Sequence, residues 1–220
     1  HLSHELKTPL ASMREGTELL ADRVAGPLTT EQQEIVEILD NSSRNLQKLI
    51  EQLLDYNRKL ADGPVERQKV DIAELAQTVV SAHSLPARAK MMSTELALDE
   101  RFCLAEPTLL TSVLDNLYSN AVHYGAESGN IRIHSYRHGE QVRIDVANSG
   151  EPIPAAERNM IFEPFYQGSH LRKGAVKGSG LGLSIARDCV RQMQGELSLV
   201  DDNPGFICFR ISLPAAEPGK

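Results

Sequence analysis

The first sixty residues carry the pattern that most restricts the fold. Apolar residues recur at steps of three and four from Leu6 to Val24, and again from Ile35 to Tyr56. This spacing places each set along one face of an α-helix. A glycine and a proline interrupt the pattern between the two sets. We therefore predict two helices joined by a short turn, an antiparallel hairpin over residues 1–60.

The sequence marks where the second helix of this hairpin begins, and the apolar faces of the hairpin require a second protein chain to cover them. Thr29 or Thr30 can cap the helix, with Gln32 or Gln33 three residues later. Two helices cannot enclose their own apolar faces, so pairing of two copies into a four-helix bundle is expected. Residues 1–60 are therefore predicted to form a homodimer.

Beyond a linker at 61–64, the pattern becomes mixed. Asp71 and Glu74 have the spacing of a capping box, at the start of a helix that reaches about Leu85. Helices and antiparallel strands in separate groups predict an α+β fold, a two-layer sandwich over 65–214. Residues 215–220 are expected to be a disordered tail. The predicted elements are strands at 94–98 and 102–105, a helix at 107–124, a β-hairpin at 131–146 with its turn at 137–140, a helix at 181–194 closed by Gly195, and strands at 196–200 and 205–213.

Bulk properties exclude some classes of protein. The chain of 220 residues has a net charge of −7 and no basic run, which argues against a nucleic-acid-binding surface. Cys103, Cys189 and Cys208 lack the spacing of metal ligands, so buried free thiols in a reducing compartment are expected. No apolar stretch approaches the roughly 18 residues of a membrane span. The helical pattern is already running at His1, so we expect a piece of a longer chain, attached to a membrane only through segments upstream.

His4 is the first candidate for chemistry, because it lies outside the apolar stripe of its helix. A lone surface histidine is usually inert, but the neighbours of His4 change this expectation. Glu5 could hold a proton on one ring nitrogen and leave the lone pair of the other free to attack. Thr8 lies one turn further on the same face, where its hydroxyl could position a water. Pro9 leaves the Glu5 carbonyl without a helical partner, which predicts a bend there.

Two further sets of residues suggest phosphate chemistry. Asn116 and Asn120 lie one helical turn apart, and their side-chain oxygens suit Mg²⁺ that is also bound by phosphates. The alternative is a pair of solvated asparagines. Gly178, Gly180 and Gly182 precede a helix whose N-terminus can bind an anion. Their spacing also partly matches a dinucleotide-binding fingerprint, but no βαβ unit precedes it.

The segment before these glycines is predicted to be a mobile lid, because it is polar and basic between Gln167 and Lys177. An ordinary solvated loop is the alternative. Phe162 is expected in the core, whereas Phe165 is expected in an exposed loop or a lid hinge.

Five segments, in chain order, resemble the motifs of bacterial two-component sensor histidine kinases. They are the phospho-acceptor box SHELKTPL (3–10), the asparagine box DNLYSNAVHY (115–124), the glycine box VANSGEPIP (146–154), the phenylalanine box IFEPF (161–165) and the second glycine box GSGLGL (178–183). The resemblance implies a dimerisation and phosphotransfer hairpin, followed by a Bergerat-type ATP-binding domain like those of gyrase, Hsp90 and MutL. It also implies ATP and Mg²⁺ as cofactors, in the cytoplasmic portion of a bacterial inner-membrane protein.

The resemblance also assigns roles to single residues. His4 would accept the phosphoryl group, Glu5 would assist as a base, and Thr8 would serve in removing phosphate from a partner regulator. That partner would be the receiver domain of a response regulator, of the type that activates sigma-54 promoters. Asn120 would bind Mg²⁺ with help from Asn116. The other residues expected around the nucleotide are His123, Tyr124, Asn148, Gly150, Phe165, Lys173, Lys177, Gly178, Gly180, Leu181 and Gly182.

Three positions depart from the family pattern. Asn148 stands where an aspartate normally accepts a hydrogen bond from the adenine amino group, so a weaker, uncharged hydrogen bond is expected. Pro152 replaces a glycine, and Gln167 stands where an arginine often faces the phosphates; Lys173 or Lys177 could substitute for it. Two alternatives therefore stay open: a degenerate kinase that serves as a dimeric scaffold or phosphatase, and an ATPase that drives conformational work. ATPases of this second kind lack a segment like that around His4.

Overall fold

The computed structural model describes the chain except for residues 1, 62–64, 169–179, 201–204 and 217–220, and it describes only the backbone at 2–8, 45, 48, 49 and 51–61. The chain divides into two compact units, residues 1–63 and 64–220. In the part of the chain that is described, no helix combines the length and apolar composition of a membrane span.

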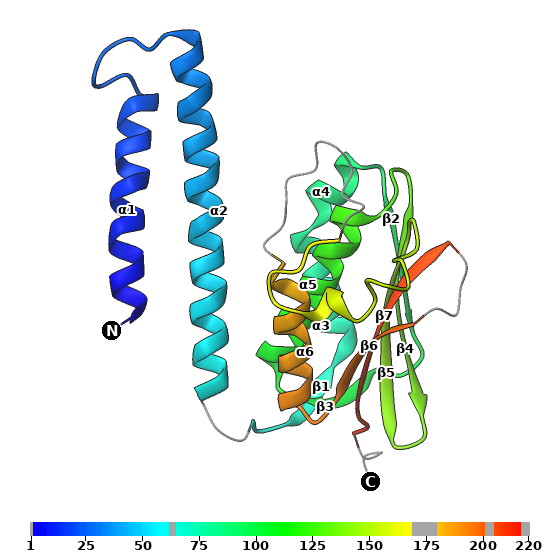
Figure 1. Ribbon diagram of the computed structural model, residues 1–220. Coiled ribbons are helices and arrows are strands. Elements are labelled where there is room, and N and C mark those ends of the chain that lie inside the picture. Colours follow the sequence, from blue (N-terminus) through cyan, green and yellow to red (C-terminus); the bar gives the residue numbers. More distant parts are fainter. Residues whose placement is uncertain (1, 62–64, 169–179, 201–204, 217–220) are drawn as a thin grey trace. The chain divides into compact units, whose positions relative to one another are not determined.

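The first unit is the predicted helical hairpin, made of α1 (Leu2–Ala21) and α2 (Thr30–Ala61) (Figure 1). The capping box lies at Thr29 and Gln32. The Thr29 backbone N–H donates to Gln32 Oε1 at 2.9 Å, and the Gln32 N–H donates to Thr29 Oγ1 at 3.2 Å. These two bonds satisfy amide groups that a helix start leaves without partners, and so they fix where α2 begins.

Only part of the apolar surface of the hairpin is covered within one chain. Leu10, Thr17, Val36 and Ser43 are buried between the two helices. Among the hairpin side chains that the structure describes, the large apolar ones that stay exposed are Met13, Leu19, Leu20, Val24, Ile35, Ile38, Leu39 and Leu46. The hairpin alone therefore leaves a long apolar surface in contact with water.

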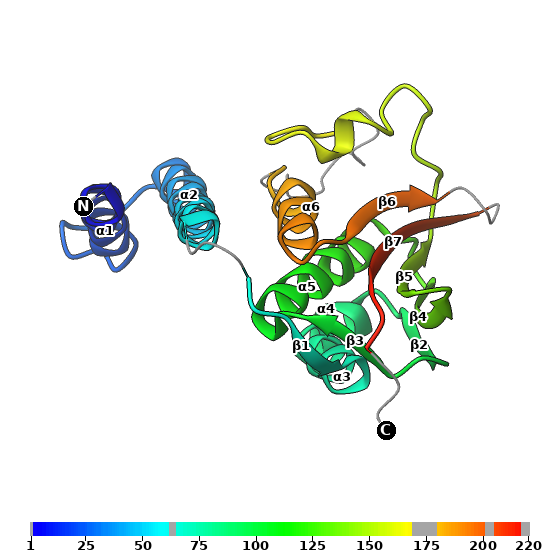
Figure 2. The ribbon, with the colours of Figure 1, turned by 90° about the horizontal axis from the view of Figure 1, so that it is seen from below.

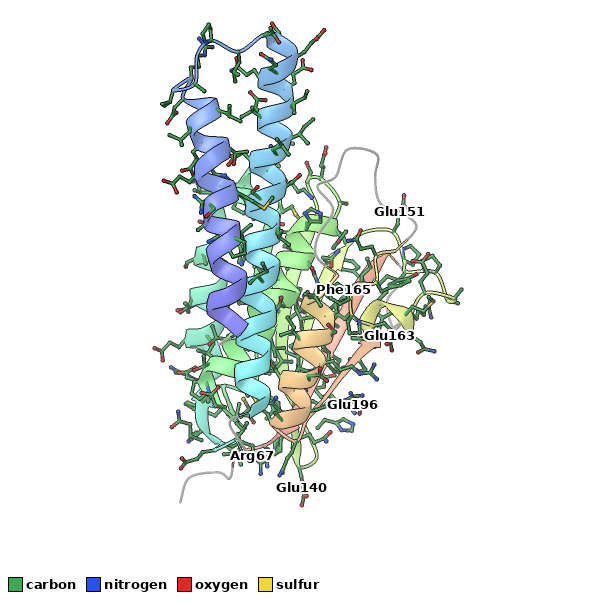
Figure 3. All side chains as sticks on the ribbon, turned by 60° about the vertical axis from the view of Figure 1, so that its left-hand side comes forward. Arg67, Glu140, Glu151, Glu163, Phe165 and Glu196 are labelled. Carbon is green, nitrogen blue, oxygen red and sulfur yellow. The ribbon has the colours of Figure 1, made fainter. Side chains whose placement is uncertain are left out.

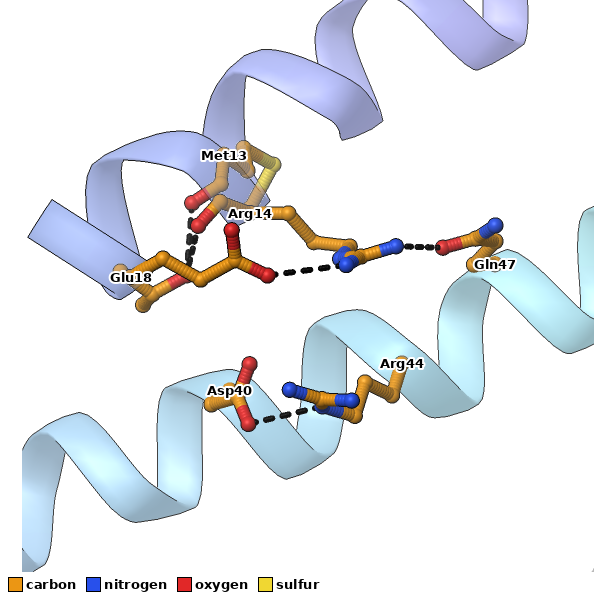
Figure 4. A network of polar contacts seen from close by, with 7 residues as sticks. Met13, Arg14, Glu18, Asp40, Arg44 and Gln47 are labelled. Atoms are coloured by element: carbon orange, nitrogen blue, oxygen red, sulfur yellow. Dashed lines mark hydrogen bonds and ion pairs between the residues drawn. The ribbon is translucent and has the colours of Figure 1, made fainter. Parts of the chain in front are cut away.

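Polar side chains add contacts along the hairpin (Figure 4). Arg14 Nη1 donates to Gln47 Oε1 at 2.8 Å, which joins α1 to α2. The second guanidinium nitrogen, Arg14 Nη2, donates to Glu18 Oε1 at 2.8 Å. On α2, Arg44 Nε donates to Asp40 Oδ2, also at 2.8 Å. Arg14 therefore links the two helices through a charge-assisted hydrogen bond.

The second unit is a two-layer sandwich with its helices on one face of a five-stranded sheet (Figures 1 and 2). The strand order is β2 (Ser93–Leu98), β4 (Asn130–His138), β5 (Gln141–Ser149), β7 (Phe206–Pro214) and β6 (Glu196–Val200). The covering helices are α3 (Ile72–Ala82), α5 (Pro107–Tyr124) and α6 (Gly182–Gln192). The smaller elements are the antiparallel pair β1 (Gln68–Asp71) and β3 (Phe102–Ala105), helix α4 (Ser84–Ala89) and the 3₁₀ helix η1 (Met160–Phe162).

The core lies between α5 and the sheet. Leu114 and Leu117 on the helix, and Ile133, Ile144 and Ile211 on the strands, have at most 1% of their surface exposed. Burial of such a side chain stabilises the fold by about 1.5–3 kcal/mol. This packing holds α5 against the sheet, and α5 carries the predicted asparagine pair.

The cysteines are free thiols, as expected, although not all are fully buried. Cys103 and Cys189 are buried, whereas Cys208 is partly exposed. Burial raises the pKa of the Cys103 thiol to about 12, with a smaller contribution from Glu100. Cys103 therefore stays protonated and unreactive at neutral pH.

The observed elements differ from the sequence-based expectations in four ways. The helix from Asp71 does not reach Leu85: α3 ends at Ala82, and α4 begins at Ser84. The reason is Pro86, which has no N–H to donate to the Ala82 carbonyl. The strands are not all antiparallel, because β2 pairs with β4 in parallel. The strand β1 was not predicted at all.

The fourth correction concerns the predicted tail. The Ala215 N–H donates to the Glu140 carbonyl at 2.8 Å, Ala215 forms a bridge with Cys103, and Ala216 is 8% exposed. These two residues therefore belong to the fold, and the rest of the predicted tail, 217–220, lies outside the described residues. Smaller shifts occur at two turns: the β4–β5 turn is confined to residues 139–140, and the left-handed residue that closes α6 is Gln194 (φ 61°), not Gly195.

Candidate functional site

A cleft of about 770 Å³ lies in the second unit. Its walls come from the end of α5 and the loop after it, the ends of β5 and β7, the connection from β5 to α6, and the first turn of α6. A cleft of this size accommodates a ligand as large as a nucleotide.

The end of α5 supplies one wall. Asn120, His123 and Tyr124 line the cleft, followed directly by Gly125 and Ala126. The His123 ring lies edge-on to the Tyr124 ring, with 4.6 Å between the ring centroids. Burial raises the pKa of the Tyr124 phenol, so the ring stays neutral at physiological pH. The wall therefore offers an aromatic surface beside an amide and an imidazole.

The end of β5 supplies a buried amide. Asn148 is only 4% exposed and lines the cleft together with Gly150. Its Nδ2 donates to the Ser149 carbonyl at 3.2 Å. The amide oxygen of Asn148 is the acceptor of this side chain, and it can accept a hydrogen bond from a ligand.

The apolar wall was missed by sequence reasoning. Ile153, Ile161, Leu183, Ile207 and Phe209 line the cleft, and they come from three separate stretches of the chain. Only the alternation along β7 gave a signal, because it places Ile207 and Phe209 on one face of the strand. Apolar side chains in the same cleft as a buried amide suit a flat heterocyclic ring.

The start of α6 approaches α5 closely. Asn116 Nδ2 donates to the Ser112 carbonyl at 2.9 Å. A Cβ added to Gly182 would lie 2.9 Å from Asn116 Oδ1, so the amide oxygen faces the first residue of α6. Leu181 is the N-cap residue of this helix and is 5% exposed. Glycine at 182 thus lets the N-terminus of α6 lie against Asn116.

Gly180 fixes the phenylalanine box next to this helix. Its φ is +70°, and its carbonyl accepts a hydrogen bond from the Phe165 N–H at 3.0 Å. A Cβ there would lie 2.7 Å from the Phe165 carbonyl carbon, so only glycine fits. Phe165 itself is 65% exposed (Figure 3) and does not line the cleft. Phe162 is buried, as predicted.

The connection from β5 to α6 adds polar groups to the rim. Pro152, Glu157, Tyr166 and Gln167 line the cleft. Desolvation raises the pKa of the Tyr166 phenol, and the Glu157 carboxylate raises it further. Two of the positions that depart from the family pattern, Pro152 and Gln167, therefore face the cleft.

Apart from Phe165, which is exposed and does not line the cleft, the predicted site residues fall into four groups. Those that line the cleft are Asn120, His123, Tyr124, Asn148 and Gly150, and those beside it at the start of α6 are Asn116, Gly180, Leu181 and Gly182. Lys173, Lys177, Gly178 and most of the predicted lid lie outside the described residues. His4, Glu5 and Thr8 belong to α1, in the other unit, where only the backbone is described.

Among the described residues, no group of three or more His, Cys, Asp and Glu side chains could hold a metal ion. Asn116 and Asn120 offer only neutral oxygens. Such a donor set fits Mg²⁺ when phosphate oxygens complete the coordination, and it does not fit a resident metal held by protein alone.

A two-layer sandwich with a nucleotide-sized cleft beside an asparagine pair is the architecture of an ATP-binding domain. Residues 105–217 match the family model of the histidine kinase-, DNA gyrase B- and HSP90-like ATPases, and residues 1–61 match the His kinase A (phospho-acceptor) domain. With both domains present in this order, the chain belongs to the sensor histidine kinases. The family and the fold class expected from the sequence are confirmed.

Individual relatives agree with this assignment. The whole chain is 73% identical to sensor histidine kinase GlrK of Escherichia coli (strain K12), over 220 residues that make up 46% of that protein. The chain therefore spans about half the length of this curated relative. The crystal structure of full-length ShkA in complex with AMPPNP matches with a TM-score of 0.75 and 28% identity, over 100% of this chain and 46% of ShkA. ThkA in complex with the response regulator protein TrrA shares the fold, with a TM-score of 0.68, 23% identity, and coverage of 98% and 60% of the two chains.

Proposed function

We propose that this chain is the kinase core of a sensor histidine kinase, which transfers the γ-phosphoryl group of ATP to His4. The observation that carries the proposal is the cleft, where Asn120, His123 and Tyr124 meet Asn148 and a set of apolar side chains. The second unit supplies a place for the nucleotide, and α1 supplies the acceptor.

Each part of the cleft suits one part of ATP. The apolar wall suits the adenine ring, and Asn148 can accept a hydrogen bond from its amino group. The start of α6 lies against Asn116, and the N-terminus of a helix suits the phosphates. Asn120, with Asn116 beside it, would hold Mg²⁺ between the protein and those phosphates. When bound, the ion would offset the charge of the phosphates during transfer.

The transfer forms one bond and breaks one. The imidazole nitrogen of His4 that carries the lone pair attacks the γ-phosphorus, and the bond from that phosphorus to the bridging oxygen breaks, with ADP as the leaving group. The proton on the other ring nitrogen passes to the Glu5 carboxylate. Positioning of the two reactants supplies most of the rate acceleration in such transfers.

The phosphorylated histidine would then pass its phosphoryl group to an aspartate of a response regulator. The fold shared with ThkA, whose structure contains the regulator TrrA, supports a partner of this class. We extend the proposal to a regulator that activates sigma-54 promoters, and to Thr8 as the residue that positions a water for the reverse, phosphatase activity. The active form would be a homodimer in the cytoplasm, part of a membrane-anchored protein.

Labelling with ATP that carries radioactive γ-phosphate tests the proposal. We expect label on the wild-type chain that is labile in acid and stable in alkali, because the product is a phosphoramidate. His4→Gln should remove the label and leave nucleotide binding intact. His138→Gln, at an exposed histidine at the end of β4, is the matched control and should label normally.

Each other outcome contradicts the proposal in a different way. Label that persists on His4→Gln would refute His4 as the acceptor. Release of free phosphate without label would indicate an ATPase. Binding of nucleotide with neither product would indicate a scaffold, as the departures at Asn148, Pro152 and Gln167 would suggest.

A further inference from the structure

Lys90 holds the last turn of α5 from outside the cleft. Its Nζ donates to the Val122 carbonyl at 2.8 Å and to the His123 carbonyl at 2.5 Å. The last carbonyls of a helix have no partner within the helix, and they lie at the negative end of its dipole. An ammonium group in this place makes two charge-assisted hydrogen bonds and fixes the turn.

A left-handed turn follows Lys90 at the end of α4. Lys90 is the C-cap of α4, and the Met92 N–H donates to the Ala87 carbonyl at 3.0 Å while the Met91 N–H donates to the Arg88 carbonyl at 2.9 Å. This pair of bonds is a Schellman motif. Its left-handed residue is Met91 (φ 54°), at a position where this motif usually has glycine. Met91 is 70% exposed, whereas the next residue, Met92, is 8% exposed.

Met92 and Ser149 fix the segment that follows the last turn. A Cβ added to Gly125 would lie 2.5 Å from the Met92 Cε, so the methionine packs directly against this backbone. The Ala126 N–H donates to the Ser149 carbonyl at 2.9 Å. Residues 123–126 are four consecutive residues that line the cleft, and they are held by Lys90, Met92 and Ser149.

We propose that Lys90 is a positioning residue for nucleotide binding. It does not line the cleft, and it acts through the backbone of residues that do. Without the ammonium group, the carbonyls of Val122 and His123 turn towards water, and the side chains of His123 and Tyr124 lose their fixed direction. The proposal rests on the proposed function of the cleft as an ATP site.

The test compares substitutions of two lysines. Lys90→Met removes the ammonium group and keeps the length of the chain, and Lys90→Arg restores two donors. Lys69→Met is the matched control, because Lys69 lies over the Phe102 ring at 4.3 Å on the β1–β3 pair, no residue of which lines the cleft. Calorimetric titration with ADP, well below each melting temperature, gives the affinity of the folded protein.

We expect Lys90→Met to weaken ADP binding about tenfold, Lys90→Arg to recover most of the affinity, and Lys69→Met to change nothing. In autophosphorylation at varied ATP concentration, Lys90→Met should raise KM and leave kcat near the wild-type value, because the lost interaction is equal in the ground and transition states. Lys90→Gln, which can donate to one carbonyl, should lie between, and it replaces Lys90→Met in the comparison if that variant does not fold.

A purely structural role predicts a different result: a lower melting temperature with unchanged ADP affinity and KM. That result overturns the proposal, as does an equal loss of affinity in Lys69→Met. A wild-type chain that binds no ADP overturns the proposed function along with it. Wild-type binding that Lys90→Met and Lys90→Gln leave unchanged overturns only the role of Lys90.

Discussion

Asp71 shows how one side chain can serve two elements. It is the N-cap of α3, where its Oδ1 accepts from the Ala73 N–H at 2.9 Å. Its Oδ2 accepts from Arg101 Nε at 2.8 Å and from Nη2 at 2.6 Å. Hydrogen bonding from Arg101 is the main reason why the pKa of Asp71 is lowered in the folded chain. Because Arg101 directly precedes β3, Asp71 ties the start of α3 to the β1–β3 pair.

The lowered pKa gives the stability of the fold a defined dependence on pH. The folded chain holds this carboxyl ionised more strongly than the unfolded chain, whose pKa is about 3.9. The contribution is therefore complete above that unfolded value, and it is lost as pH falls through the lower, folded value.

We predict that Asp71→Ala lowers the free energy of unfolding by about 1 kcal/mol near neutral pH, the usual effect of losing an N-cap. The difference from the wild type should shrink as pH falls below the unfolded pKa, because the wild type then loses the same contribution. Urea denaturation at a series of pH values measures this. Asp99→Ala, at a carboxylate that is 74% exposed and bonded to His134, is the control and should have a smaller effect at neutral pH. A loss that stays the same at every pH would contradict the linkage.

At the scale of single elements, the Schellman motif at the end of α4 predicts how a substitution of Met91 changes the stability of the chain. A left-handed conformation costs an L-residue roughly 1–2 kcal/mol, and glycine avoids this cost. The larger conformational entropy that glycine loses on folding cancels about half of that gain. Met91 is 70% exposed, so its side chain contributes little packing. Met91→Gly should therefore stabilise the chain by about 0.5–1 kcal/mol, seen as a higher midpoint in thermal or urea unfolding.

The control for this prediction is a glycine introduced within α4, which ends before Met91. Leu85 is also exposed, at 75%, but it lies within α4 and has no positive φ. Leu85→Gly should destabilise the chain by about 1 kcal/mol. Equal destabilisation by both substitutions would show that Met91 has no backbone strain for glycine to relieve.

The sequence predicted elements best where capping residues lie at their ends. The bounds of α5 agree with the structure because Glu106 caps the Leu109 N–H at 2.6 Å, Pro107 occupies the first turn, and Gly125 follows the end. The strand β1 was missed because its four residues, two of them charged, show no clear alternation. The break at His83 has no glycine beside it; its only signal was the proline three residues further on.

For the whole molecule, the sequence indicated the motifs but not how they meet. Asn120 and Asn148 lie on different elements, and only the pairing of β5 with β4 and β7 brings the end of β5 next to the end of α5. The parallel pairing of β2 with β4 depends on which strands become neighbours, which no local pattern records. The site was predicted through resemblance to a family. The apolar wall, which belongs to no motif, was found only in the structure.

The last prediction concerns dimerisation of the hairpin, because a single chain leaves the apolar surface of α1 and α2 exposed to water. Ile38 is 64% exposed and Val24 is 69% exposed. Each apolar side chain that becomes buried in a second copy contributes about 1.5–3 kcal/mol, so eight such positions favour a dimer strongly. We expect the chain to sediment as a dimer at micromolar concentration.

Ile38→Lys should raise the dissociation constant of this dimer at least tenfold, since a loss of about 1.4 kcal/mol is enough for that change. Leu85→Lys alters a side chain with similar exposure in the other unit, and it should leave the dimer intact. Sedimentation equilibrium of the three proteins measures both effects. A wild-type chain that stays monomeric at every concentration would mean that the open surface of α1 and α2 is covered by something other than a second copy, and the bundle would then need a different partner.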